Sequence, residues 1–312
     1  NGFENLYPLT YLRPIYELKC GIYSLLDKIK IYLGDNKYYH HSRNVLSSVL
    51  DEKYESIITS NFPDEDIIFI NGKVLFNDKF KFDVLNLKPN EALVNNDDLL
   101  AAFISKDNIQ KLIFDENGLL DFNKINLTKI EYDTITIKFP WDLVNNNSNE
   151  IINDFKLFNK SNNLNKKLDY VSIKNKKDIF ISSSADISPF VYFDASEGPI
   201  IIDSNVKILS HTYLKGPIYI GKNSLVKANT SIYHGTSIGQ FCKVGGEIEE
   251  SIIHSYSNKQ HDGFLGHSYL AEWINLGAGT NNSDLKNNYS KISVLLNGKN
   301  VFTNSQFVGV VI

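Results

Sequence analysis

A six-residue repeat in the second half of the chain constrains the fold more than any other feature. Eight aliphatic residues stand six apart without a miss. Neither the 3.6-residue period of an α-helix nor the alternation of a flat strand gives this spacing. A six-residue period is typical of a parallel β-helix, in which each hexad supplies one short strand and one corner. The members of this aliphatic column are Ile202, Ile208, Leu214, Ile220, Val226, Ile232, Ile238 and Val244.

A second column follows four residues after the first and holds small or β-branched side chains. We expect the aliphatic column to point inward and the second column to fill the narrow corners. Gly221, Gly239 and Gly245 directly follow aliphatic positions, where a tight corner favours glycine. The pattern begins near residue 181 and slips at Gly198-Pro199. The second column comprises Val206, Thr212, Ile218, Ser224, Thr230, Thr236, Cys242 and Ile248.

The repeat is interrupted after Ile252-Ile253. Residues His254–Gly263 show no inward column, so we expect a loop that leaves the coil. Loops on a rigid scaffold are common positions for functional sites. The pattern resumes at Leu265 and weakens after Gly279. The last residues, 307–312, resemble an interrupted repeat, and we expect that residues are missing at both ends of the chain.

The first 140 residues predict a mixed α/β domain. Asp66–Ile70 is a short apolar run that fits a buried strand. Asn96-Asp97-Asp98 precedes the apolar run 99–104 and fits the start of a helix. Residues Thr134–Phe139 alternate as a strand does.

A helix is then expected from Pro140 to about Phe158, because Ile151, Phe155 and Phe158 share one helical face. Trp141 fits a packing anchor for this helix. The stretch Asn159–Lys167 is rich in Asn, Lys and Ser, which indicates a linker. The predicted organisation is an α/β domain at 1–140, a linker helix and connector at 141–180, and a left-handed parallel β-helix at 181–312.

Composition excludes several classes of protein. The net charge of −4 comes without a basic stripe, which argues against a nucleic-acid binder. No apolar run reaches the roughly 18 residues that a membrane span needs. The two cysteines, Cys20 and Cys242, can form neither a disulfide framework nor a cysteine zinc site. We therefore expect a cytoplasmic protein.

The β-helical region resembles a known enzyme family. His261-Asp262-Gly263-Phe264-Leu265-Gly266 and Asn275-Leu276-Gly277-Ala278-Gly279-Thr280 are similar to two motifs of the bifunctional glucosamine-1-phosphate acetyltransferase/N-acetylglucosamine-1-phosphate uridyltransferase family. The spacing between the motifs matches without a gap. One departure is Phe264, which stands where the family has tyrosine.

This resemblance implies an acetyl-CoA-dependent acyltransferase that assembles as a homotrimer, with acyl-CoA bound between neighbouring β-helices. It implies that His261 is the general base, since acyl transfer needs a group that takes a proton from the attacking amine or hydroxyl. Asn275, Gly277, Ala278 and Gly279 would line the acyl-CoA groove. The family's phosphate-binding Arg and Lys fall near Tyr233 and near Glu249 or Ser251, so the acceptor of the acetyl group is open.

The N-terminus carries a second resemblance. The segment Leu6–Pro14 is similar to the signature of sugar-1-phosphate nucleotidyltransferases, and Pro140–Leu143 to a motif that joins the two halves in some members. Together they suggest a divergent two-domain member of a type found in Bacteroidetes-like bacteria. The implied contacts to nucleotide and phosphate are Leu9, Thr10, Arg13 and Lys19.

Two departures concern the nucleotidyltransferase half. Ile15 replaces the signature lysine, and the Gly-rich loop is absent or precedes the first residue. The family uses Mg²⁺, held by an Asp at the end of a strand, but this strand continues as Ile70-Asn71-Gly72-Lys73. A carboxylate is the usual ligand for that ion, so the metal site is undetermined.

The leading hypothesis is a bifunctional enzyme of nucleotide-sugar synthesis for the cell envelope. It would use a sugar phosphate and a nucleoside triphosphate in one half, and acetyl-CoA and an amino sugar in the other. The alternatives are that only one half is active, for example the acyltransferase, or that the β-helix is a non-catalytic trimeric scaffold. Glu247, Glu249 or Glu250 could orient His261.

The other histidines predict no site. We expect His254 and His267 at the surface. The spacing of His211, His234 and His254 matches no repeat of the coil, which argues against a three-histidine zinc site.

Overall fold

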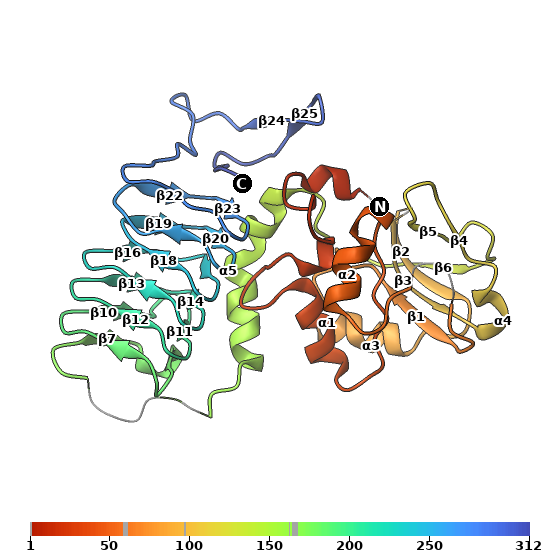
Figure 1. Ribbon diagram of the computed structural model, residues 1–312, viewed down its shortest axis with the longest axis horizontal. Coiled ribbons are helices and arrows are strands. Elements are labelled where there is room, and N and C mark those ends of the chain that lie inside the picture. Colours follow the sequence, from red (N-terminus) through yellow and green to blue (C-terminus); the bar gives the residue numbers. More distant parts are fainter. Residues whose placement is uncertain (1, 59–61, 97, 162, 164–167) are drawn as a thin grey trace. The chain divides into compact units, whose positions relative to one another are not determined.

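The computed structural model describes residues 2–58, 62–96, 98–161, 163 and 168–312. The chain forms two compact units. The first joins Asn1–Leu18 to Ser24–Lys138, and the second joins Lys19–Tyr23 to Phe139–Ile312. In Figure 1 the first unit runs from red to yellow, and the second, apart from its short segment 19–23, from yellow-green to blue.

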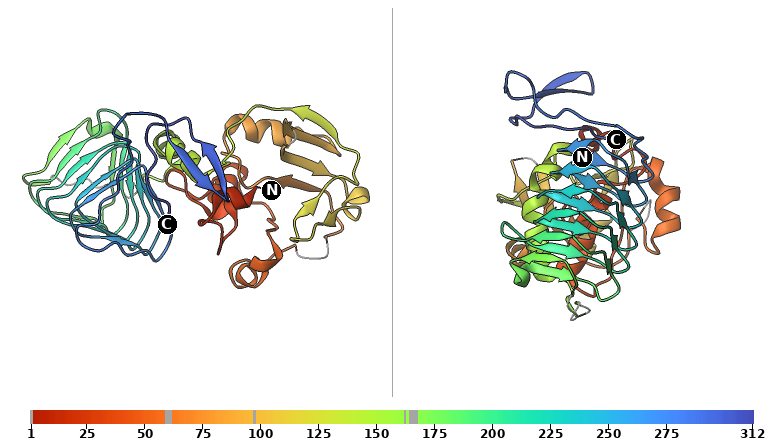
Figure 2. Two further views of the ribbon diagram at one scale, coloured as in Figure 1. Left: turned by 90° about the horizontal axis from the view of Figure 1, so that it is seen from above. Right: turned by 90° about the vertical axis from the view of Figure 1, so that its left-hand side faces the viewer.

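The second unit contains a parallel β-solenoid of about six turns, consistent with the left-handed β-helix that the hexads predict. Figure 2 shows its coils stacked in register. One sheet contains β7 (Ser172–Lys174), β10 (Tyr192–Asp194), β13 (Tyr213–Lys215), β16 (Ser231–Ile232), β19 (Glu247–Glu249) and β22 (Phe264–Gly266). The next contains β8 (Ile179–Ile181), β11 (Ile200–Ile202), β14 (Ile218–Ile220), β17 (Thr236–Ile238), β20 (Ile252–Ile253) and β23 (Tyr269–Leu270). The third contains β9 (Asp186–Ile187), β12 (Lys207–Ile208), β15 (Leu225–Val226), β18 (Lys243–Val244) and β21 (Asn258–Lys259).

The aliphatic column forms the core of the solenoid. Ile202 lies opposite Ile220, and Ile220 lies opposite Ile238, so equivalent positions of successive coils stack on one another. Every member of the column from Ile202 to Val244 is fully buried, and so is the column that fills the corners. The prediction that the aliphatic column points inward is confirmed, and the residues expected at the corners are buried as well.

The loop expected at His254–Gly263 was a wrong prediction. The coil continues through this segment: β20, β21 and β22 pair with β17, β18 and β19. Lys259 occupies the inward position opposite Val244 and is only 2% exposed. A search for apolar residues misses this coil because its inward residue is a lysine.

The interior accepts Lys259 because its ammonium group is hydrogen bonded. The Nζ atom donates to the backbone oxygens of Gly245 at 2.9 Å and His261 at 2.8 Å, with Asp262 at 3.4 Å. The aliphatic stem can replace an apolar side chain in the column while the charged end reaches carbonyl oxygens. His254 is also buried, with its Nδ1 3.0 Å from Glu272 Oε1, so its expected surface position was wrong.

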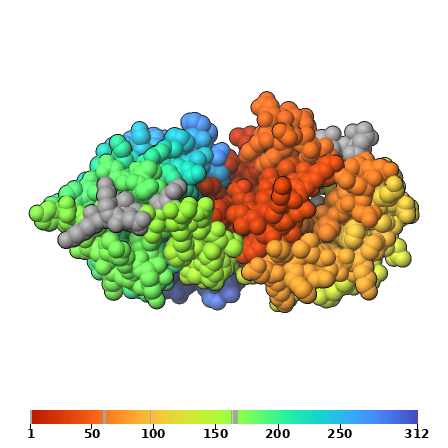
Figure 3. All heavy atoms as spheres, turned by 90° about the horizontal axis from the view of Figure 1, so that it is seen from below, coloured from red at the N-terminus to blue at the C-terminus, as the bar shows by residue number. Residues whose placement is uncertain are grey.

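Helix α5 (Pro140–Leu157) packs against the outer face of the sheet that contains β11 and β14. Ile151, Phe155 and Phe158 belong to one cluster with Phe180, Ile201 and Tyr219, which confirms the predicted apolar face. Figure 3 shows the yellow-green atoms of α5 beside the green first coils. Trp141 is buried and stacks on Phe139.

The segment Lys19–Tyr23 is held in the second unit by α5. The Gly21 amide donates to Asn147 Oδ1 at 2.6 Å, and the Ile22 amide donates to Asp154 Oδ2 at 2.8 Å. Both acceptors are buried. Hydrogen bonds to these buried side chains fix the backbone of the segment against α5.

The C-terminal residues return to the solenoid. After β23 the chain forms a hairpin of β24 (Ser293–Leu296) and β25 (Lys299–Phe302). Val311 then bridges Tyr269 in parallel, and the Tyr269 amide donates to Val310 O at 2.9 Å. The apolar residues near the end thus add to the last described coil.

The first unit is an α/β fold around a sheet with the strand order β1-β3-β2-β6. Only β2 and β6 are parallel. The strands of the unit are β1 (Ile67–Ile70), β2 (Glu91–Asn95), β3 (Asp98–Ile104), β6 (Thr128–Glu131) and the small pair β4 (Ile113–Phe114) and β5 (Leu120–Asp121). Its helices are α1 (Leu25–Leu33), α2 (Ser47–Lys53), α3 (Asp78–Leu85) and α4 (Lys106–Ile109), with short 3₁₀ turns at Phe3–Leu6, Ile15–Glu17 and Asn44–Leu46.

Sequence patterns gave mixed results in this unit. The strand expected at Asp66–Ile70 is confirmed as β1. The helix expected after Asp98 is wrong, because this run forms β3, and Asn96 turns the chain with a φ of 48°. Asp97, part of that prediction, lies outside the described residues. A short apolar run fits either element by periodicity, and here the hairpin with β2 decided it.

The predicted strand at Thr134–Phe139 is also wrong as a regular element. Thr136 makes a single antiparallel bridge to Val74, and helix α5 begins at Pro140. Of the predicted linker, residues 162 and 164–167 lie outside the described residues. Among the described residues, no helix is long and apolar enough to cross a membrane.

Candidate functional site

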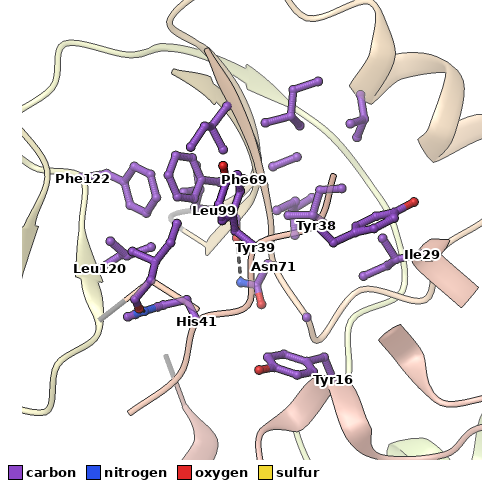
Figure 4. A pocket seen from close by; sticks show the side chains of 18 of the residues that line it. Tyr16, Ile29, Tyr38, Tyr39, His41, Phe69, Asn71, Leu99, Leu120 and Phe122 are labelled. Carbon is purple, nitrogen blue, oxygen red and sulfur yellow. Dashed lines mark hydrogen bonds between the residues drawn. The ribbon is translucent and has the colours of Figure 1, made fainter. Parts of the chain in front are cut away.

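The first unit contains a cavity of about 990 Å³ along β1. Its lining comes from β1 and Asn71, from residues 38–41, from helices α1 and α3, and from residues 119–127. Figure 4 shows Tyr38, Tyr39 and His41 together with Phe69, Leu120 and Phe122 around it. At one end of the cavity the Asn71 side chain is held in place, since its Nδ2 donates to Leu99 O at 2.8 Å.

Three buried polar groups in the lining have no hydrogen-bond partner within the described part of the chain. They are the Tyr16 hydroxyl and the Nε2 atoms of His40 and His41. His41 Nδ1 lies 2.8 Å from Ile58 O, so Nδ1 carries the proton and Nε2 is left as an acceptor. Burial raises the pKa of Tyr16 and lowers that of His41, so both are neutral. Uncharged hydrogen-bonding groups thus lie in the lining beside charged side chains such as Asp66, Asp121 and Lys129.

A smaller cavity of about 120 Å³ adjoins the first and shares Tyr16, His41 and Asn71 with it. It is lined by three cationic side chains, Arg13, Arg43 and Lys73. Clustered cations of this kind suit phosphate oxygens. Arg43 and Lys73 were not predicted from the sequence, because each belongs to an unremarkable local pattern.

The contacts of Arg43 and Lys73 show how these two cations are held. The Arg43 guanidinium donates to Tyr7 Oη at 3.3 Å and to the Thr10 carbonyl oxygen, and it lies over the Phe3 ring. Lys73 is buried, and its Nζ is 2.9 Å from Asp98 Oδ2. Arg43 thus supports the segment that carries Thr10 and Arg13.

The N-terminal residues that the resemblance implies as nucleotide and phosphate contacts lie in different parts of the structure. Leu9 and Thr10 are buried, and the Thr10 hydroxyl donates to Phe3 O at 2.8 Å. Arg13 lines the smaller cavity. Lys19 belongs to the second unit, where its backbone amide donates to Tyr269 Oη at 2.9 Å.

The residues after β1 do not fit a resident magnesium ion. Asn71-Gly72-Lys73 supplies no carboxylate, and Lys73 places an ammonium group there. Gly72 packs under Tyr16, whose Cβ would lie 2.7 Å from a Cβ at position 72. The described residues contain no group of three or more His, Cys, Asp or Glu that could hold a metal ion.

In the second unit, the motif residues lie on two stacked turns of the solenoid. His261 is exposed on the turn between β21 and β22. Asn258 bridges Asn275 in parallel, and a Cβ at Gly263 would lie 2.1 Å from Thr280 O. The turn of His261 is therefore stacked on the turn of Gly277-Ala278-Gly279.

The glycine turn leaves open space. Asn275, Gly277, Ala278 and Gly279 are all exposed. Apart from the adjacent residues of the chain, no described heavy atom lies within 4 Å of a Cβ built at Gly277 or at Gly279. This turn can therefore accept a ligand at close range, next to the turn that carries His261.

The acidic residues considered as partners of His261 are engaged elsewhere or exposed. His234 Nε2 lies 3.2 Å from Glu250 Oε1, and its Nδ1 lies 3.7 Å from Glu249 Oε1. Glu247 is exposed on β19. The closest support for the His261 turn comes instead from Lys259, which donates to the His261 carbonyl.

Comparison with known proteins decides the family. A family model described as sugar nucleotidyl transferase matches residues 1–163, which is more than half of the chain. The chain belongs to the sugar nucleotidyl transferase family. This membership makes it a transferase, and its first unit a nucleotidyltransferase-like domain.

Two curated relatives of this family member are described as bifunctional, and the name of the first gives both activities. A bifunctional sugar-1-phosphate nucleotidylyltransferase/acetyltransferase of Sulfurisphaera tokodaii is 25% identical over 97% of this chain and 80% of its own length. The bifunctional protein GlmU of Anaplasma marginale, strain Florida, is 31% identical over 33% of this chain and 24% of its own length. The first similarity spans both units.

Proposed function

We propose that this protein is bifunctional, with nucleotidyl transfer to a sugar 1-phosphate in the first unit and acetyl transfer from acetyl-CoA in the β-helix. The proposal is supported by the similarity to the Sulfurisphaera relative over nearly the whole chain. The observation that carries the acetyltransferase half is the stack of the His261 turn on the open Gly277–Gly279 turn.

In the acetyltransferase half, His261 acts as the general base. Its imidazole takes a proton from the attacking amine or hydroxyl, whose lone pair forms the new bond to the thioester carbonyl carbon. The carbon–sulfur bond then breaks, and the CoA sulfur leaves with the electron pair and takes up a proton. Asn275, Gly277, Ala278 and Gly279 line the groove for acetyl-CoA, where the missing side chains leave room.

The acetyltransferase works as a homotrimer, with acetyl-CoA bound between neighbouring β-helices. His261 and the glycine turn are both exposed in the single chain, which fits a site completed by a second copy. The trimer acts in the cytoplasm, where acetyl-CoA and sugar phosphates are available. Nucleic acid and membrane play no part in the proposed activity.

In the nucleotidyltransferase half, Arg13 contacts the phosphates in the smaller cavity. Arg43 holds the backbone of this segment through the Thr10 carbonyl. The sugar phosphate oxygen attacks the α-phosphorus of a nucleoside triphosphate, and pyrophosphate leaves. Because the residues after β1 do not fit a resident metal, we assign no step to one.

A second candidate function is acetyl transfer alone. It is favoured by the missing carboxylate after β1 and by the ion pair that engages Lys73. The bifunctional and single-activity proposals share the β-helix site and differ only in the first unit.

Two product assays on one preparation separate these candidates. Pyrophosphate release and CoA release are measured independently on a panel of amino-sugar phosphates and nucleoside triphosphates. The bifunctional proposal predicts both products. CoA release without pyrophosphate would leave acetyl transfer alone, and pyrophosphate without CoA would overturn the acetyltransferase half.

A further inference from the structure

Several turns at one corner of the β-helix, between the sheet of β21 and the sheet of β22, are closed in the same way. A threonine at the fourth position of the turn donates its hydroxyl to the carbonyl oxygen at the first position. Such a local bond from side chain to backbone ties the two ends of the turn together. The three pairs, at 2.7, 2.7 and 2.8 Å, are Thr212 with Leu209, Thr230 with Lys227 and Thr280 with Gly277.

The turn that carries His261 lies at the same corner and departs from this pattern. Its fourth position is Gly263, where a Cβ atom would lie 2.1 Å from Thr280 O. The backbone there has a φ of 112°, which residues with a side chain rarely adopt. A threonine therefore does not fit. The close stacking of the His261 turn on the Gly277–Gly279 turn excludes the side chain that closes the other turns.

Lys259 supplies a replacement from inside the coil. Within the turn, its Nζ atom donates to His261 O at 2.8 Å and to Asp262 O at 3.4 Å. It also donates to Gly245 O, in the preceding coil, at 2.9 Å. Hydrogen bonds from a charged donor are stronger than those from a neutral hydroxyl. The ammonium group thus holds the carbonyl groups of the histidine and of the residue after it.

An aliphatic residue would be enough to fill the core at position 259. The equivalent positions of the preceding coils are Ile208, Val226 and Val244, which are fully buried. Burial disfavours the charged form of Lys259 and lowers its pKa, although the nearby Asp262 opposes this shift. The lysine therefore carries a cost that an aliphatic residue would not, and it stands in the coil from which the His261 turn begins.

We propose that Lys259 is the positioning residue for His261, an inference that rests on the proposed acetyltransferase activity. Lys259 is only 2% exposed, so it acts through the backbone and contacts neither acetyl-CoA nor the acceptor. By holding the His261 carbonyl inward, it fixes where the imidazole leaves the coil beside the Gly277–Gly279 turn. Proton transfer needs the base within hydrogen-bond reach of the nucleophile, so a looser turn slows this step.

Kinetics of CoA release compare two matched variants. Lys259→Met removes the three bonds and keeps an unbranched stem. It should lower kcat at least about tenfold and leave the KM for acetyl-CoA within about twofold, because the base is misplaced while the glycine turn is intact. Thr212→Val removes the bonds to Leu209 O and Lys227 O in a turn of another coil. It also loses buried hydrogen bonds, but kcat and KM should stay unchanged.

The His261→Ala background shows whether Lys259 acts through the base. In that background Lys259→Met should change kcat less than about twofold, because no imidazole is left to position. An equal loss of kcat in both backgrounds would overturn the proposal. A kcat of Lys259→Met equal to that of the parent would overturn it as well.

Backbone NMR relaxation provides a readout that does not depend on activity. In Lys259→Met the order parameters of the Asp262 and Gly263 amides should fall from about 0.85 towards 0.6, whereas Thr212→Val should leave them unchanged. Rigid amides in Lys259→Met, with CoA release by the parent, would overturn only the role of Lys259. Loosened amides without CoA release by the parent would instead overturn the proposed acetyltransferase activity.

Discussion

The β-helix and the first unit differ in how their cores are specified. In the β-helix each inward residue stacks on its equivalent in the next coil, as Ile202, Ile220 and Ile238 do. In the first unit the core joins side chains from helices and strands far apart in the sequence, such as Ile29, Phe80 and Leu100. A periodic core can be identified from a single sequence, whereas an aperiodic core depends on pairings that local pattern does not encode.

The largest effect is expected when the proposed general base of the β-helix site is removed. His261→Ala should lower kcat for CoA release by about 10²–10⁴-fold, which is the usual contribution of a general base. The affinity for acetyl-CoA and the oligomeric state should change little, since the side chain is exposed. His211→Ala, an exposed histidine on another coil, is the control. CoA release within a few-fold of the parent would remove His261 from the mechanism.

A matched pair of core deletions probes the two kinds of core. Ile220→Ala and Leu100→Ala each remove a fully buried aliphatic side chain, one from each unit. Each should lower the free energy of unfolding by about 2–5 kcal/mol. Thermal unfolding, monitored by hydrogen exchange in each unit, should show the loss of stability only in the unit that carries the substitution. Equal loss in both units would show that they unfold as one body.

A substitution at Lys259 tests the lysine that continues the inward stack of Ile208, Val226 and Val244. Lys259→Met keeps an unbranched stem but leaves the carbonyls of Gly245 and His261 without this donor. The expected cost is about 1–3 kcal/mol, measured by chemical unfolding. Lys243→Met, at an exposed position of the adjacent coil, should cost far less. A more stable Lys259→Met variant would show that the buried charge costs more than its hydrogen bonds contribute.

The smallest effect concerns Glu250. Burial raises the pKa of its carboxyl group, against the opposing charges of His234 and His267. A raised folded-state pKa means that this contribution to stability is full below the unfolded pKa and is lost as pH rises through the folded pKa. Glu250→Gln mimics the protonated form.

The stability of Glu250→Gln relative to the parent should therefore increase between about pH 4 and pH 7, by less than about 1 kcal/mol because the group is only partly buried. Unfolding midpoints measured across this range provide the test, with the exposed Glu247→Gln as control. A decrease over the same range would mean that the ion pair with His234 outweighs the burial of the carboxylate.

How well the sequence predicts the structure also differs between the periodic β-helix and the aperiodic first unit. The hexad columns and the apolar face of α5 were readable because their spacing repeats. The coil through Lys259 was missed because hydrogen bonds to carbonyl oxygens, invisible in the sequence, make a lysine acceptable inside. β3 was mistaken for a helix because its pairing with the distant β1 and its hairpin with β2 do not follow from the period of a short apolar run. Arg43 and Lys73 were missed for the same reason, since only the fold brings them near Arg13.

The most direct test of two separate transferase activities is a cross-comparison of His261→Ala and Arg13→Ala in both product assays. The account predicts that His261→Ala loses CoA release by about 10²–10⁴-fold and keeps pyrophosphate release. It predicts that Arg13→Ala loses pyrophosphate release, by about tenfold or more, and keeps CoA release. A parallel loss of both products in either variant, with the fold intact by circular dichroism, would contradict the assignment of one activity to each unit.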